Sequence, residues 1–209
     1  MNVHDALSQI ADIRQQVARA QTFRGYRPMT TAFTGVMAIA TAIVQSRIMP
    51  NPTPVWTGAG QDPFRVDHYL YLWFVAAVLS LAVVGWEMWV RVRRSGSDLQ
   101  RDITLAAVEQ FVPSLMAGVL VTIVITQFAL ESIWIIPSLW MILFSMGVYS
   151  SRRVLPRYAG VIAGYYLLAG LMVMALHKDA GMHAWTMGAV FGVGQFLAAA
   201  WLWFVERRT

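Results

Sequence analysis

The sequence contains no cysteine and few charged residues. Without thiols the chain forms no disulfide bond and offers no thiolate nucleophile, iron–sulfur ligand or cysteine-ligated zinc site. Charged residues make up 13% of the 209 residues, where soluble domains carry roughly 25%. Hydrophobic residues make up 57%. This balance indicates that lipid, rather than water, surrounds most of the chain.

Lysine is also nearly absent, because Lys178 is the only lysine among 16 basic residues. The net charge of +5 would favour a nucleic-acid partner in a soluble protein. Here the arginines stand in short segments between apolar stretches, a distribution that is typical of membrane orientation. We therefore expect the lipid bilayer, and no nucleic acid, as the partner of these charges.

Six apolar stretches follow one another, each about long enough to cross a hydrocarbon layer roughly 30 Å thick as a helix. They predict an all-α fold, a polytopic membrane bundle of six transmembrane helices within residues 28–209. The predicted spans are about 30–48, 69–90, 106–130, 133–150, 158–176 and 184–205. Four of the eight prolines fall within residues 50–68, which predicts an irregular connection there.

Residues 1–27 predict an amphipathic helix that precedes the first span. Apolar residues recur along it at steps of three and four, and they form one narrow stripe: Ala6, Ile10, Ile13, Val17 and Ala20. Such a helix either lies on lipid headgroups or docks a protein partner. We adopt partner docking as the hypothesis, because six spans already anchor the chain.

The basic residues indicate the orientation in the membrane. Thirteen lie in the N-terminal segment, the second and fourth connections and the tail, and three lie in the other connections. The richer side is cytoplasmic by the positive-inside rule, so both termini are predicted to be cytoplasmic. The amphipathic rings of Trp56, Trp73, Trp134 and Trp185 are predicted at the outer interface.

No catalytic motif is visible, and we predict that the protein is not an enzyme. The sequence has no G-x-S-x-G, H-E-x-x-H or phosphate-loop lysine pattern. All seven aspartates lie outside the predicted spans, which excludes intramembrane aspartyl chemistry. Glu87 and Arg91 stand one helical turn apart and predict an ion pair at the inner interface.

Three histidines, His68, His177 and His183, fall at the outer ends of predicted spans. Imidazoles at one membrane level could ligate haem, a chlorin or a metal ion. Interfacial histidine is also an ordinary polar residue. We predict no cofactor and keep ligation as an alternative.

Small residues predict close helix packing in the last two spans. The predicted packing residues are Gly160, Gly164, Gly188, Gly192 and Gln195. Because the spans are neighbours in the chain, we expect these residues to bring the two spans together or to contact a partner subunit.

The segments from Ile13 to Val36 and from Pro137 to Gly164 resemble those of an uncharacterised family of small bacterial multi-pass membrane proteins. The similarity covers most of the chain. It implies a bacterial cytoplasmic (inner) membrane location and brings no catalytic residues.

Three functions remain open from the sequence. The first is a non-enzymatic accessory, regulatory or assembly subunit that acts through helix packing and a cytoplasmic docking helix. The second is a small carrier or channel lined by Gln45, Gln127 and Gln195. The third is a cofactor-bearing subunit of an electron-transfer or light-harvesting assembly.

Overall fold

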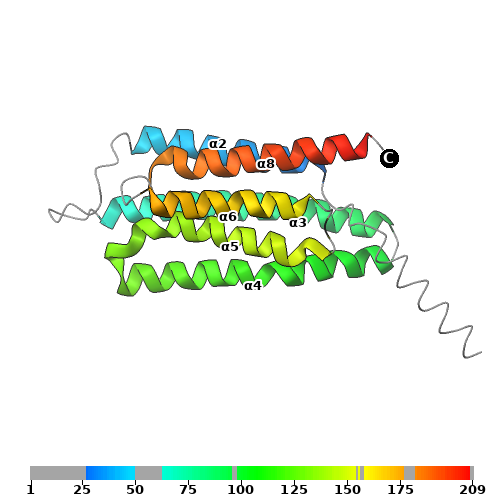
Figure 1. The fold of residues 1–209 in the computed structure, drawn as a ribbon, viewed down its shortest axis with the longest axis horizontal. Coiled ribbons are helices and arrows are strands. Elements are labelled where there is room, and N and C mark those ends of the chain that lie inside the picture. The colour runs from blue at the N-terminus through cyan, green and yellow to red at the C-terminus, as the bar shows by residue number, and fades with distance from the viewer. Residues whose placement is uncertain are drawn as a thin grey trace, which may run out of the picture.

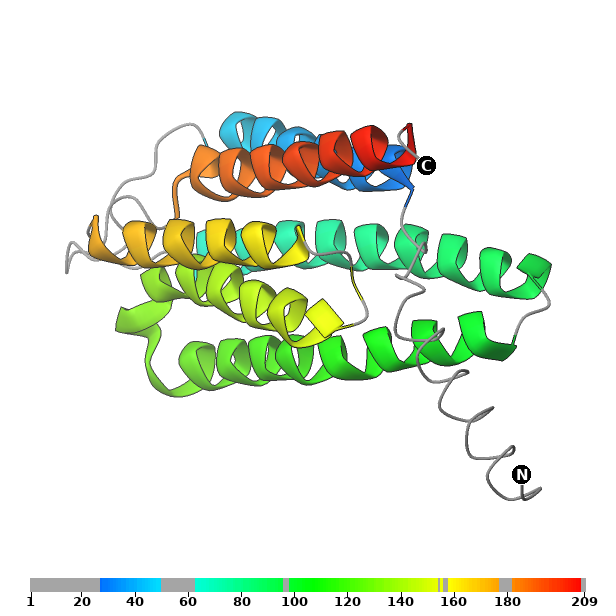
Figure 2. The ribbon, with the colours of Figure 1, turned by 45° about the vertical axis from the view of Figure 1, so that its right-hand side comes forward.

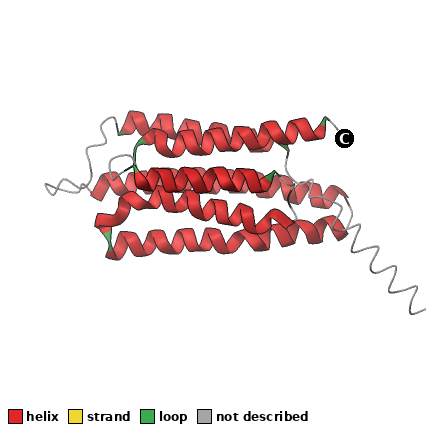
Figure 3. Cartoon of the chain, viewed as in Figure 1, coloured by secondary structure: helices red, strands yellow, loops and turns green. Residues whose placement is uncertain are grey.

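The computed structural model describes residues 27–49, 63–95, 98–153, 155, 158–176 and 182–207. Every regular element in these ranges is a helix (Figures 1 and 3). The long helices are α2 (Pro28–Ile48), α3 (Pro63–Ser95), α4 (Asp98–Phe128), α5 (Ile136–Ser150), α6 (Ala159–Ala175) and α8 (Ala184–Glu206). Two short 3-10 helices, η1 (Leu130–Ile135) and η2 (Ser151–Arg153), flank α5.

Among the described residues, five helical segments are long and apolar enough to cross a membrane, and they lie in α2, α3, α4, η1 with α5, and α8. Helix α6 is apolar but shorter, with 17 residues. The structure thus confirms an all-helical chain whose long apolar helices are compatible with a membrane bundle. Residues 1–26 of the predicted N-terminal helix, which include its whole apolar stripe, lie outside the described residues.

The helices run side by side along one long axis (Figures 1 and 2). Helix α2 packs along α8, α5 lies between α4 and α6, and α3 contacts α2 and α4. Successive helices alternate in direction, so the start of α2 and the ends of α3, α5 and α8 meet at one end of the bundle. We call it the basic end, because it carries Arg27, Arg91, Arg93, Arg152 and Arg207.

The main core lies toward the opposite end and draws on five helices. Its buried residues are Ala38, Ala42, Tyr69, Trp73, Met141, Val173 and Met187. Helix α4 lies at the edge of the bundle, since Thr104 and Ala107 are its only buried residues among those described, whereas six residues of the shorter α5 are buried. One face of α4 therefore points away from the rest of the described chain.

Helices α3 and α4 form a hairpin that extends past α5 and α6 at the basic end (Figure 2). With a rise of about 1.5 Å per residue, the 33 residues of α3 span roughly 50 Å and the 17 of α6 roughly 25 Å. The predicted irregular connection was wrong for residues 63–68, which are already helical because Pro63 fits the first turn of α3.

Candidate functional site

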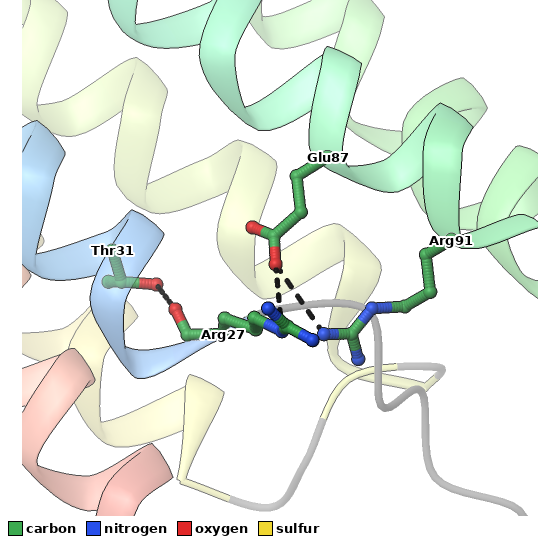
Figure 4. A network of polar contacts seen from close by, with 4 residues as sticks. All are labelled: Arg27, Thr31, Glu87 and Arg91. Carbon is green, nitrogen blue, oxygen red and sulfur yellow. Dashed lines mark hydrogen bonds and ion pairs between the residues drawn. The ribbon is translucent and has the colours of Figure 1, made fainter.

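A carboxylate at the basic end joins two helices. Glu87 Oε1 lies 3.4 Å from Arg91 Nη2 and 3.7 Å from Arg27 Nε (Figure 4). The Glu87 side chain is 18% exposed, whereas that of Arg27 is 66% exposed. Arg27 directly precedes α2, and its carbonyl oxygen accepts a hydrogen bond from Thr31 Oγ1. Glu87 therefore holds the start of α2 beside the end of α3.

Sequence spacing points to Arg91 as the partner of Glu87 but gives no sign of Arg27. The two residues are 60 positions apart, and only the fold brings them together. The available signal was topological: a basic residue at the start of the first span and an acidic residue near the end of the second lie on the same side of a membrane.

A second polar cluster lies near the opposite end of the bundle, inside the core. Trp73 Nε1 donates a hydrogen bond to Gln45 Oε1 at 2.8 Å. Gln45 Nε2 in turn donates to the carbonyl oxygen of Met182 at 3.0 Å. Gln45 is 3% exposed and Trp73 is 4% exposed. One amide thus joins α2, α3 and the segment that leads into α8.

This cluster corrects the sequence prediction for Trp73. An indole ring near the end of a span was expected at the lipid interface, but Trp73 lies in the core. Its ring packs with apolar neighbours while its N–H reaches the buried amide of Gln45, which satisfies both groups in a dry interior.

Further polar side chains connect neighbouring helices in the same manner. Trp140 Nε1 donates to Thr122 Oγ1 and joins α5 to α4, and Ser145 Oγ donates to Ala163 O and joins α5 to α6. Tyr165 Oη donates to Val190 O between α6 and α8, and Ser151 Oγ donates to Ala107 O between η2 and α4. These polar groups are used in helix association.

The glycine-rich face of α8 packs against α2. A Cβ atom at Gly188 would collide with that of Ala42, and one at Gly192 would lie 2.8 Å from Ile39 Cγ1. The Cβ of Gln195 lies 3.1 Å from a Cβ built at Gly35. The expectation that the last two spans meet at these glycines was wrong for Gly188 and Gly192, because α2 packs against both of them.

The other predicted packing motif, Gly160 and Gly164, makes no close helix contact within the described part of the chain. A Cβ atom built at Gly160 or Gly164 meets nothing within 4 Å among the described residues. The close approach of α6 to α5 occurs instead at Gly170, whose added Cβ would lie 3.0 Å from Ser138 O. A partner subunit at Gly160 and Gly164 stays a prediction.

The histidines do not form a site within the described ranges. His68 and His183 are exposed, and His177 lies outside the described residues. His183 Nδ1 accepts a hydrogen bond from the backbone N–H of Trp185. In the described part of the chain, no group of three or more histidine, aspartate or glutamate side chains is placed to hold a metal ion.

Together, the apolar helices and their internal polar bonds define a multi-pass α-helical membrane protein. No protein-family model, no curated protein and no solved structure matches the chain. The resemblance to an uncharacterised bacterial family therefore stays a prediction.

Proposed function

We propose that the protein is a non-enzymatic accessory, regulatory or assembly subunit of a membrane protein complex. In this proposal the chain crosses a bacterial inner membrane six times, with both termini in the cytoplasm. It acts through its transmembrane faces and through a cytoplasmic docking helix at residues 1–27.

The observation that carries the proposal is the use of the polar groups within the spans. Polar side chains in transmembrane helices often mark the path of a substrate or ion. Here Gln45, Trp73, Trp140, Ser145 and Tyr165 bond from one helix to another. These polar groups therefore stabilise the packing of the helices, which is the role expected of them in a subunit that serves as a scaffold.

The surface of α4 gives further support. Its exposed side chains include Val112, Met116, Leu120 and Ile123, so this edge helix presents a long apolar face to lipid or to a neighbouring transmembrane helix. The carrier alternative receives less support, since Gln45 is engaged in two bonds and Gln127 is exposed on α4.

The test is purification in mild detergent, followed by mass analysis of the chains that elute with the protein. Deletion of residues 1–20 should leave insertion and abundance unchanged but release a partner chain. Ile10→Asp and Ile13→Asp should do the same by placing a charge in the apolar stripe. Gln16→Asp, on another face of the predicted helix, is the matched control and should retain the partner.

A membrane-surface helix gives a different result. The co-eluting chains would then be the same with and without residues 1–20, and replacement of Arg14 and Arg19 by glutamine would alter the protein more than the isoleucine changes. That outcome would contradict the docking role.

A further inference from the structure

Three arginines at the basic end lie over aromatic rings that stand three or four residues earlier in the chain. Arg93 Cζ is 4.1 Å from the ring centroid of Trp89, and Arg207 Cζ is 3.6 Å from that of Trp203. Arg152 Cζ is 4.0 Å from the ring centroid of Tyr149. These distances are well within the range of about 6 Å over which a cation is attracted to an aromatic face.

The three pairs share one position in the fold. They occupy the ends of α3, α5 and α8, which meet at the basic end (Figure 1). Trp89, Tyr149 and Trp203 are between 42% and 50% exposed, so each ring faces outward from the bundle. Exposed aromatic rings at the end of a transmembrane helix lie at the level of the lipid headgroups. Each guanidinium group is therefore held at that level.

The charge of this end is positive overall. Among the described side chains the basic end carries seven arginines and four carboxylates, and the opposite end carries one arginine and two carboxylates. A guanidinium group over a ring keeps a planar set of N–H donors, which matches the oxygens of a phosphate group. The adjoining ring offers an apolar surface to the glycerol and upper acyl chain of the same lipid.

We propose that the Arg93–Trp89, Arg152–Tyr149 and Arg207–Trp203 pairs are binding sites for anionic phospholipid headgroups. Each arginine binds the phosphate, and each ring both positions the arginine and contacts the apolar part of the lipid. Anionic lipid in the leaflet at the basic end then stabilises the bundle by binding the folded protein at these three helix ends.

The experiment measures the midpoint of thermal unfolding in a nonionic detergent, with added phosphatidylglycerol or phosphatidylcholine. Phosphatidylglycerol should raise the midpoint clearly more than phosphatidylcholine does. The triple variant Arg93→Gln, Arg152→Gln, Arg207→Gln should lose most of this difference. Arg47→Gln, which makes the same substitution at one arginine of the opposite end, is the control and should keep the difference.

Two further arms separate the lipid from simpler explanations. Inorganic phosphate should raise the midpoint much less than phosphatidylglycerol, because it has no apolar part to contact the rings. The triple change of the same arginines to lysine keeps the charge but not the planar donors, and it should retain only part of the lipid effect. Trp89→Leu and Trp203→Leu should each weaken the stabilisation by phosphatidylglycerol. These two variants test the proposal if the triple variants do not fold.

Three results would overturn the proposal. The first is an undiminished effect of phosphatidylglycerol on the triple glutamine variant or, where that variant does not fold, on both tryptophan variants. The second is an equal effect of phosphatidylcholine. The third is an equal effect of inorganic phosphate, which would assign the site to a free anion.

Discussion

Two fully buried tyrosines differ in what their hydroxyl groups meet. Tyr166 Oη donates to the carbonyl oxygen of Phe191 at 3.5 Å. Tyr69 Oη is buried without a hydrogen-bond partner among the described residues. A buried polar group without a partner destabilises the folded state, whereas a bonded one does not. The two residues therefore form a matched pair for measuring the contribution of a buried hydroxyl.

Tyr69→Phe should raise the free energy of unfolding by about 1 kcal/mol, because the change removes an unpaired hydroxyl and keeps the ring. Tyr166→Phe should lower the stability, because it removes a hydroxyl group that is hydrogen-bonded in the folded state. Thermal unfolding in detergent measures both. A fall in the midpoint for Tyr69→Phe would show that its hydroxyl has a bonding partner and would contradict this assignment.

Gln45 is the residue on which the inner polar cluster depends. Gln45→Leu strands the N–H of Trp73 and the carbonyl oxygen of Met182, and it should cost about 1–3 kcal/mol of stability. A double-mutant cycle with Trp73→Phe should give a coupling energy on the order of 1 kcal/mol, since the two side chains bond directly. Additive effects of the two changes would argue against the bond.

The ion pair of Glu87 with Arg27 contributes less to stability than the buried hydrogen bonds of Gln45, because the Arg27 side chain is largely exposed. Glu87→Gln should lower the stability by no more than about 1 kcal/mol, the range of exposed ion pairs. Added salt should reduce the difference between the two proteins by screening the charges. A loss of cellular function at an unchanged protein level would reveal a role of the carboxylate beyond joining α2 to α3.

Among the elements, α2 and α8 form the pair in closest contact. Their backbones approach at Gly188, where a methyl group would collide with the Cβ of Ala42. Ala42 has no flexible end that could move aside. The separation of these two helices is therefore fixed by the absence of a side chain at Gly188.

Gly188→Ala should destabilise the protein by about 1–3 kcal/mol, the usual cost of forcing extra volume into a packed contact. Gly160→Ala and Gly164→Ala are the controls on α6, where the added methyl group meets no atom of the chain within 4 Å in the described part. Alanine favours the helix over glycine by up to about 1 kcal/mol, so these two changes should leave stability unchanged or raise it. Equal destabilisation at Gly188 and Gly160 would contradict the α2–α8 contact.

The bounds of the helices along the chain could largely be predicted from the sequence, but the sequence did not predict which helices pack against each other. Hydrophobicity and length are properties of one helix, and the predicted spans lie within or close to α2, α3, α4, α5, α6 and α8. A small-residue motif predicts close packing without saying which helix provides the contact, and α2 rather than α6 lies against Gly188. The prediction that Trp73 lies at the outer interface failed for a similar reason. An indole ring can lie at the lipid interface, but it can also be buried when its N–H has a hydrogen-bond partner.

The candidate sites show the same division. The spacing of Glu87 and Arg91 along one helix was sufficient to predict their pairing. The contacts of Glu87 with Arg27 and of Gln45 with Trp73 join residues 60 and 28 positions apart, and no local pattern encodes such contacts. The stripe at Ala6, Ile10, Ile13, Val17 and Ala20 stays a prediction, since it lies outside the described residues.

In the proposed topology the whole molecule crosses the membrane six times. The lack of native cysteine makes this directly measurable, because a single introduced cysteine is then the only thiol in the chain. Connections on one side of the membrane should share the same access to a reagent that cannot cross it. Helix α3 ends and α4 begins at the basic end, on either side of Gly96 in the sequence, whereas α2 ends and α3 begins at the other end.

The decisive measurement is labelling of single cysteines in intact cells with a membrane-impermeant maleimide. Cysteines at Gly58 and Asp179 should be labelled in intact cells, and cysteines at Gly96, Ser151 and Thr209 should be labelled only after the cells are opened. Labelling at Gly96 together with protection at Gly58 would reverse the orientation. Equal protection of Gly58 and Gly96 in intact cells would show that α3 does not cross the membrane and would contradict the six-span account.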